Sequence, residues 1–175
     1  LGPFLDRFQL SFKLDYYTDE ELKEILKKVA NAWGLELEEE VAQKLARAGK
    51  GIPRQALNLL RRLMEFMHHR CPSEAPLKVS STDLSEFFRL LDIDEWGLTP
   101  EDRRCLFTLY RDFKGGPVGL TSLALSSRIS PEELETLYEP ALIRLGLIAR
   151  TRRGRVLTKL GEKYLKEKNL FNVSF

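Results

Sequence analysis

Apolar residues recur every three or four positions through the first 70 residues, and this spacing predicts helices. The first helix is expected to begin at residues 18–21, Thr-Asp-Glu-Glu, which have the spacing of a capping box, and to end at Gly34. A second is expected over 38–48. A third begins at Pro53, because proline suits the first helical position. Because no sheet is expected beside these three helices, residues 18–71 are predicted to form a small all-α bundle.

The chain divides at a segment rich in proline and serine, which predicts a linker over residues 72–80. Residues 1–17 form a connecting segment whose partial alternation near its end indicates a short strand or extended entry. A second domain is expected over 81–168, and the tail, 169–175, carries no assignable pattern.

The second domain has the element order of a winged helix, namely helices followed by a β-hairpin. A capping box with proline at the first helical position begins the helix before the hairpin at Ser130. Two short apolar runs joined by a basic, glycine-containing turn predict the hairpin, and an amphipathic helix follows from Thr158. The expected fold class is mainly α, a helical bundle followed by a winged-helix domain with a small β-hairpin wing.

Charge is unevenly distributed along the chain, although the net charge is only +2. The helix before the hairpin carries Glu132, Glu133, Glu135 and Glu139 on what is expected to be its exposed face. Residues 144–168 contain five arginines and four lysines against two glutamates. A basic segment of this kind is typical of a phosphate-binding face.

The hairpin is the strongest candidate for chemistry, because four arginines lie in six residues: Arg150, Arg152, Arg153 and Arg155. Guanidinium groups match phosphate oxygens, although a solvated turn is the simpler alternative. The acidic helix argues against base reading, since its glutamates would be repelled by phosphates, and Pro140 removes a backbone donor within it. We therefore predict DNA binding through the backbone, without sequence preference.

Other classes of function find little support. The two cysteines and the adjacent pair His68–His69 do not form a zinc pattern, so no metal site is predicted. The isolated cysteines suggest a reducing, cytoplasmic location, and no apolar run approaches the ~20 residues needed to span a bilayer. Arg54, in the first turn of a helix, suits an anion, with an ordinary surface arginine as the alternative. No P-loop motif is present, so this chain is not expected to hold a nucleotide alone.

Seven short motifs occur in a fixed order: Asp-Arg-Phe at 6–8, Tyr-Thr-Asp-Glu-Glu-Leu at 17–22, Gly-Ile-Pro-Arg at 51–54, Leu-Leu-Arg-Arg at 59–62, Gly-Gly-Pro-Val-Gly-Leu at 115–120, Tyr-Glu-Pro at 138–140, and Arg-Thr-Arg-Arg-Gly-Arg at 150–155. The first four resemble the small ATPase, or lid, domain of the RuvB family of Holliday-junction branch-migration motors. The last three resemble the winged-helix domain of that family.

The resemblance implies the lid and DNA-binding portion of an AAA+ ATPase that uses ATP with Mg²⁺. It implies a homohexamer that works with RuvA on duplex DNA and Holliday junctions. Arg7 matches the arginine finger, which is offered to the nucleotide of a neighbouring subunit. Tyr17 matches a residue lining the nucleotide, and Arg54 the sensor-2 arginine. The chain is expected to be a fragment without the large ATPase domain, and so without ATPase activity or a RuvA-docking region.

In the wing, the resemblance makes Arg150 and Arg155 contacts to the DNA backbone, with Arg152 and Arg153 as further candidates. At the start of the acidic helix a family member may carry a basic residue that contacts DNA, but this chain has Pro131 there. Arg128 is a candidate to supply the missing contact. Two other hypotheses remain open at this stage. One is an origin initiator or regulator that binds a preferred DNA site, and the other is a winged-helix adaptor that binds only protein.

Overall fold

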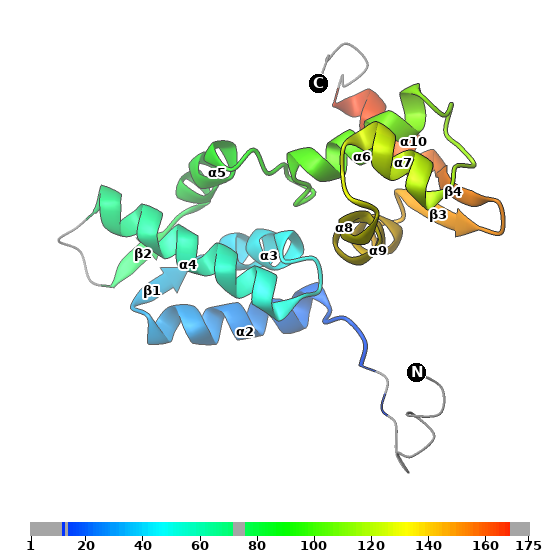
Figure 1. Ribbon diagram of the computed structural model, residues 1–175. Helices are drawn as coiled ribbons and strands as arrows, with labels where there is room; N and C mark the ends of the chain where they lie inside the picture. The colour runs from blue at the N-terminus through cyan, green and yellow to red at the C-terminus, as the bar shows by residue number, and fades with distance from the viewer. Residues whose placement is uncertain (1–11, 13, 72–75, 169–175) are drawn as a thin grey trace.

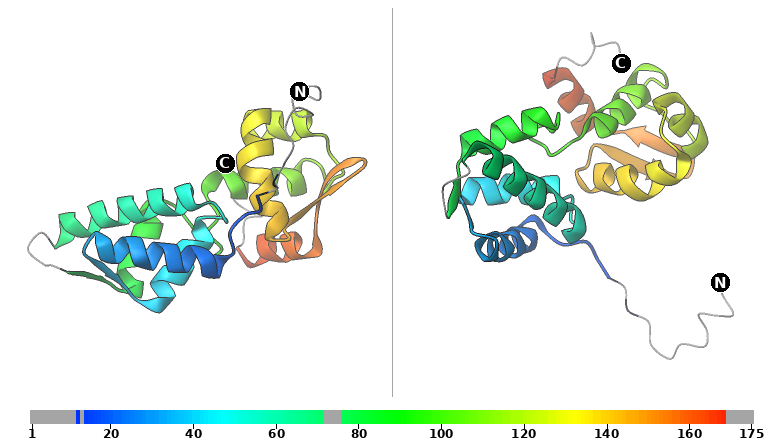
Figure 2. Two further views of the ribbon diagram at one scale, coloured as in Figure 1. Left: turned by 90° about the horizontal axis from the view of Figure 1, so that it is seen from below. Right: turned by 60° about the vertical axis from the view of Figure 1, so that its left-hand side comes forward.

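The chain folds into two bodies, each with its own hydrophobic core. The computed structural model describes residues 12, 14–71 and 76–168. One core spans residues 22–88 and the other residues 98–165. The two bodies lie end to end, the first at the left and the second at the right of Figure 1, and Figure 2 shows the same arrangement from two further sides.

The first body is a helical bundle with a small sheet at one edge. Its elements, in chain order, are α2 (Asp19–Ala32), β1 (Leu35–Leu37), α3 (Glu39–Ala48), α4 (Pro53–Arg70), β2 (Leu77–Val79) and α5 (Ser81–Leu90). The predicted capping box is present at the start of α2, where Thr18 accepts from the Glu21 backbone and the Glu21 side chain accepts from Thr18. Leu22, Leu26 and Ala30 bury one face of α2. The local helix signals therefore produced the predicted helices.

The prediction of a bundle without strands is wrong. β1 pairs with β2 in parallel, with Leu35 opposite Leu77 and Leu37 opposite Val79. Leu35, Leu77 and Val79 are buried in the first core, so the sheet closes one edge of the bundle. A three-residue strand whose partner is 42 residues away leaves no periodic signal in the sequence.

This pairing also moves the domain boundary. Residues 77–90 were predicted to lie in the linker and the winged-helix domain. However, Leu84, Phe87 and Phe88 of α5 belong to the first core. Leu91 and Ile93 also pack against the first core and Trp96 against the second, so the junction between the bodies falls at residues 94–95 rather than at the proline-containing segment.

The second body has winged-helix topology. Its elements are α6 (Pro100–Arg111), α7 (Leu120–Ser127), α8 (Pro131–Glu133), the π-helical turn η1 (Leu134–Tyr138), α9 (Glu139–Arg144), β3 (Ile148–Thr151), β4 (Gly154–Leu157) and α10 (Lys159–Glu167). β3 and β4 form the predicted antiparallel hairpin. Leu106, Leu142 and Tyr164 are among the side chains buried between the helices and the hairpin.

The helix before the hairpin is interrupted by a π-helical turn. The Glu139 N–H donates to the carbonyl of Leu134, five residues earlier, and Pro140 follows without an N–H to donate. The extra residue in this turn changes the direction that later side chains face. As a result Glu139 points into the protein, where it is 3% exposed.

The two bodies meet at the loop between α3 and α4. Lys50 Nζ pairs with the Asp102 carboxylate of α6, and both side chains are almost completely buried. The guanidinium of Arg144, on α9, donates to the Lys50 carbonyl. The backbone of Gly97 lies so close to Ala48 that a Cβ on Gly97 would stand 2.7 Å from the Ala48 Cα. The contacts therefore converge on one short loop.

Candidate functional site

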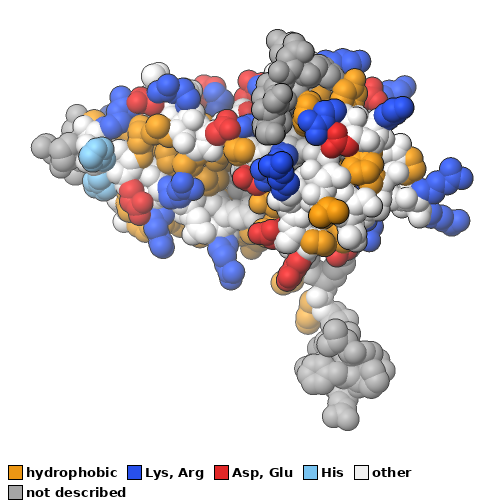
Figure 3. All heavy atoms as spheres, turned by 45° about the horizontal axis from the view of Figure 1, so that its top comes forward, with side chains coloured by type: hydrophobic (Ala, Val, Ile, Leu, Met, Phe, Trp, Pro, Cys, Tyr) orange, Lys and Arg blue, Asp and Glu red, His pale blue; other side chains and the backbone are white. Residues whose placement is uncertain are grey.

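The hairpin presents arginine side chains at its tip. Arg152 and Arg153 form its two-residue turn, between Thr151 and Gly154, which face each other across the strands. The Thr151 hydroxyl accepts from the Arg153 N–H at 3.2 Å and donates to the Gly154 carbonyl at 2.8 Å, which fixes the turn. Arg150, Arg152 and Arg153 are exposed. In Figure 3 basic side chains, drawn in blue, project from the right-hand end of the molecule, where the hairpin lies in Figure 1.

Arg155 occupies a different environment from the other three arginines. Its side chain is 8% exposed, and its Nε and Nη2 donate to Glu139 Oε2 at 3.0 and 2.7 Å. A guanidinium that is buried and bonded in this way does not face a ligand outside the domain. This geometry favours a role for Arg155 in holding the hairpin against α9, while the direct contact to the DNA backbone stays a prediction.

Arg150 lies opposite Arg155 across the hairpin but keeps its guanidinium in solvent. Its side chain is 59% exposed, and its nearest carboxylates, Glu135 and Glu139, are 3.7 and 3.9 Å away. These separations exceed hydrogen-bond length, so Arg150 is paired only loosely. A phosphate can compete for its guanidinium.

The surface of the acidic helix carries fewer carboxylates than the sequence predicts. Glu132, Glu133 and Glu135 are exposed, but Glu139 is buried beneath the hairpin. Glu133 is occupied in the predicted capping box, where its side chain accepts from Ser130. Three exposed carboxylates still make this helix a poor surface for a phosphate-lined groove.

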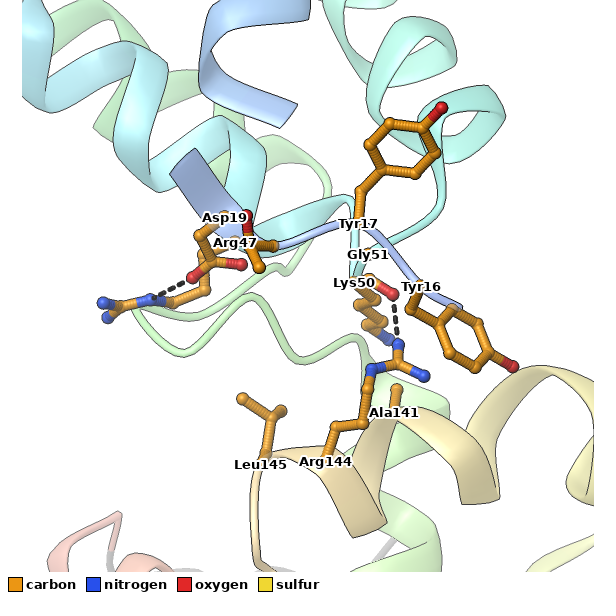
Figure 4. A pocket seen from close by; sticks show the side chains of 10 residues that line it. Tyr16, Tyr17, Asp19, Arg47, Lys50, Gly51, Ala141, Arg144 and Leu145 are labelled. Atoms are coloured by element: carbon orange, nitrogen blue, oxygen red, sulfur yellow. Dashed lines mark hydrogen bonds and ion pairs between the residues drawn. The ribbon is translucent and has the colours of Figure 1, made fainter. Parts of the chain in front are cut away.

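A pocket lies where the first body meets α9. Its volume is about 330 Å³, and its walls are the residues shown in Figure 4: Tyr16, Tyr17, Thr18, Asp19, Arg47, Lys50, Gly51, Ala141, Arg144 and Leu145. The Tyr17 N–H donates to the Gly51 carbonyl at 3.0 Å, which brings the entry segment against the α3–α4 loop. The Tyr17 ring points away from Arg144 in this view. Arg54 is exposed in the first turn of α4 and does not line the pocket.

The sequence did not identify Arg144, which is the charged residue that the second body contributes to this pocket, beside Ala141 and Leu145. Its guanidinium lies 3.7 Å from the centre of the Tyr16 ring, a cation–π contact, and it also binds the Lys50 carbonyl. Both partners are more than 90 residues away in sequence, so no local motif marks the residue. Arg7, the predicted arginine finger, lies outside the described residues.

Arg128, the remaining predicted DNA contact, lies at the turn between α7 and α8. It is exposed and adopts a left-handed conformation, φ 53°, as the C-cap of α7. Within the described ranges, no three His, Cys, Asp or Glu side chains gather as metal ligands. No helix in the same ranges is long and apolar enough to cross a membrane.

Both bodies match known domain families. Residues 17–94 match the family described as the RuvB AAA lid domain, and residues 95–166 match the RuvB C-terminal winged helix domain. The border between the two matches falls in the junction defined by the two hydrophobic cores.

Relatives cover nearly all of this chain. It is 40% identical over 167 residues to the Holliday junction branch migration complex subunit RuvB of Solibacter usitatus, which covers 95% of this chain and 47% of that protein. The RuvB subunit of Fervidobacterium nodosum is 39% identical over 94% of this chain and 46% of its own length. The chain thus spans about half the length of the curated relatives it matches.

Solved structures agree with the sequence comparison. The Thermotoga maritima RuvB Holliday junction branch migration motor superposes with a TM-score of 0.85 at 36% identity, over 95% of this chain and 54% of that one. The match extends over both bodies, and the two domain families matched are both RuvB domains. The chain belongs to the RuvB family, of which it forms the lid and winged-helix domains.

Proposed function

We propose that this chain is the lid and DNA-gripping part of a RuvB-type motor that drives Holliday-junction branch migration with ATP. Its own task in that motor is to hold duplex DNA by the phosphate backbone, independently of sequence. A motor that moves along DNA gains from such contacts, because base-specific contacts would hold it at preferred sites.

One observation carries this proposal, namely the division of charge within the winged-helix domain. The hairpin presents the exposed guanidiniums of Arg150, Arg152 and Arg153, whereas the helix that reads bases in a helix-turn-helix protein presents exposed carboxylates. Phosphate contact is thereby favoured and base contact disfavoured. Arg128, exposed at the turn before α8, adds a further cation.

The first body contributes the lid's share of an ATP site. Tyr17 offers an aromatic surface beside Gly51, and Arg54 offers a cation at the positive end of α4. The sequence has no P-loop, so these residues fit the rim of a nucleotide site rather than its phosphate cradle. When bound, ATP with Mg²⁺ would supply the free energy of phosphoryl transfer. Arg54 would stabilise phosphate charge, and Arg7 would do so at a neighbouring subunit's site.

The remaining assignments also rest on membership of the family. We infer a homohexamer, a partnership with RuvA, and action in the bacterial cytoplasm. The proposed hexamer accounts for an arginine finger acting in trans, since Arg7 would then have a neighbouring site to serve.

The salt dependence of DNA binding tests the proposal. Binding of this chain to a fluorescent duplex should weaken steeply with salt and be equal for unrelated duplex sequences. The triple variant Arg150→Gln, Arg152→Gln, Arg153→Gln should reduce the slope of log K against log salt by about 2 to 3, at ~0.9 per lost phosphate contact. A matched control is Lys28→Gln, Arg61→Gln, Arg89→Gln, which removes three exposed charges from the first body and should leave the slope unchanged.

The same measurement separates the motor from a site-specific regulator. If one duplex sequence binds at least 100-fold more tightly than the others, or if the triple variant alters the ranking of sequences, the regulator is favoured. If the triple variant and the control have the same salt slope, the hairpin is not the part of the chain that binds DNA.

A further inference from the structure

The winged-helix domain contains a second cluster of guanidiniums away from the hairpin. Arg104 and Arg111 lie on α6 one above the other, with Phe107 and Thr108 between them, and Arg128 reaches the same place from the end of α7. Together with Ser126 these residues line a groove of about 110 Å³, which we name the α6–α7 groove.

The chemistry of the α6–α7 groove suits a phosphate group. Its lining offers guanidinium donors and two hydroxyls, those of Thr108 and Ser126, but no carboxylate. The lining therefore selects a small oxyanion.

Arg104 carries the most direct sign of a missing ligand. The residue is half-buried, and its Nε is buried without a hydrogen-bond partner in the described part of the chain. Leaving a buried charged donor unpaired is costly, and a phosphate oxygen would remove that cost. Neither Arg104 nor Arg128 forms a salt bridge to a carboxylate of the described residues, whereas Arg111 is paired with Asp112 at 2.6 Å.

Besides Asp112, the carbonyl end of α7 brings negative charge near the groove, and part of that charge is satisfied. Ser126 and Arg128 lie at the carbonyl end of α7, where partial negative charge disfavours anions. Those carbonyls are capped, since the Ile129 and Arg128 N–H groups donate to Ala124 and Leu125 at 3.0 and 3.2 Å. Arg111 is held in place by a cation–π contact, with its guanidinium carbon 5.0 Å from the Phe107 ring centre.

We propose that the α6–α7 groove binds a phosphate of the DNA backbone and is a second grip beside the hairpin. Arg104 and Arg128 supply its uncompensated charge, and Arg111 with the two hydroxyls orients the oxyanion. The inference rests on the proposed DNA binding of this chain, and it assigns that binding a position that the hairpin does not reach.

The decisive variants are Arg104→Gln and Arg128→Asn. Asparagine at 128 tolerates the left-handed backbone, so it removes the charge without straining the α7 cap. Each should weaken duplex binding roughly tenfold, the value of one charged hydrogen bond, for all sequences alike. The double variant should lower the salt slope by about 2. Arg61→Gln with Arg89→Gln is the control, and Arg104→Lys, which keeps the charge, should retain most of the slope.

An NMR measurement tests ligand binding at the α6–α7 groove directly. The Arg104 Nε–H resonance in a ¹H–¹⁵N spectrum should shift when duplex DNA is added and also, more weakly, with inorganic phosphate. A shift with inorganic phosphate but not with DNA would identify a site for free small anions and overturn the proposal. An unchanged salt slope in the double variant would overturn it as well.

The two proposals fail separately in these experiments. If the unmodified chain does not bind duplex DNA at all, the proposed function is lost, and a DNA phosphate in the groove is lost with it. If the chain binds DNA and only the hairpin variant weakens it, the function stands and the groove proposal alone is wrong.

Discussion

Glu139 Oε2 accepts two hydrogen bonds from the guanidinium of Arg155, at 2.7 and 3.0 Å, and both side chains are buried. This pair joins α9 to β4 and so fixes the hairpin to the helix before it. Glu139 can point inward because the π-helical turn precedes it. The orientation of the exposed arginines at the tip thus depends on a buried carboxylate.

Replacing Arg155 with Met should destabilise the second body by about 3–5 kcal/mol, because it leaves Glu139 buried without its cation. Urea unfolding followed by circular dichroism measures this change in the free energy of unfolding. Adding Glu139→Gln should recover part of the loss. Arg150→Gln is the matched control, and since its ion pairs are long and exposed it should cost no more than ~1 kcal/mol. If the Arg155 and Arg150 variants lower the free energy of unfolding equally, Arg155 does not have the structural role assigned to it.

Lys50→Met should loosen the junction between the two bodies. The substitution leaves the Asp102 carboxylate buried without its cation, at a cost of about 3–5 kcal/mol. We expect the radius of gyration from small-angle X-ray scattering to increase and unfolding to separate into two transitions. Glu24→Gln, an exposed change on α2, should alter neither quantity. A single, unshifted transition in Lys50→Met would show that this ion pair does not couple the bodies.

The Glu39 carboxylate should titrate at unusually low pH. Lys27 and Lys23, at 2.7 and 2.9 Å, lower its pKa from 4.5 to about 2 through hydrogen bonds and charge. Because the pKa is depressed in the folded state, the stabilisation is present above pH 4.5 and is lost as the pH falls toward 2. An NMR titration of the carboxyl carbon measures the pKa, and Lys27→Gln should raise it. The pair is exposed, so its effect on overall stability is small.

The two thiols should differ sharply in reactivity. Burial raises the pKa of Cys105 to about 12, with Asp102 and Glu139 adding to the effect. Since the thiolate is the reactive form, a colorimetric disulfide reagent at pH 8 should modify the half-buried Cys71 first and Cys105 only upon unfolding. Modification of both thiols at one rate in the folded protein would contradict the burial of Cys105. Cys105→Ala provides the single-thiol control.

Local signals explain what the sequence predicted correctly. The predicted capping boxes at Thr18 and Ser130 both begin helices, because each needs only residues within one turn. The hairpin was likewise predicted from neighbouring residues, since its turn is two residues long.

The missed features all depend on contacts between distant residues. The β1–β2 pairing joins residues about 40 apart, and the partners of Arg144 are more than 90 residues away. Periodicity does not reveal such contacts. Arg150 and Arg155 look equivalent in the sequence, and only the inward direction of Glu139 makes one a buried structural residue and the other an exposed one.

The loop between α3 and α4 has a consequence for movement. Lys50 is held from both sides, its Nζ by Asp102 and its carbonyl by Arg144, so this loop fastens the lid to the winged-helix domain. Two bodies fastened in this way act as one lever arm. A small rotation of the lid would therefore become a larger displacement at the tip of the hairpin.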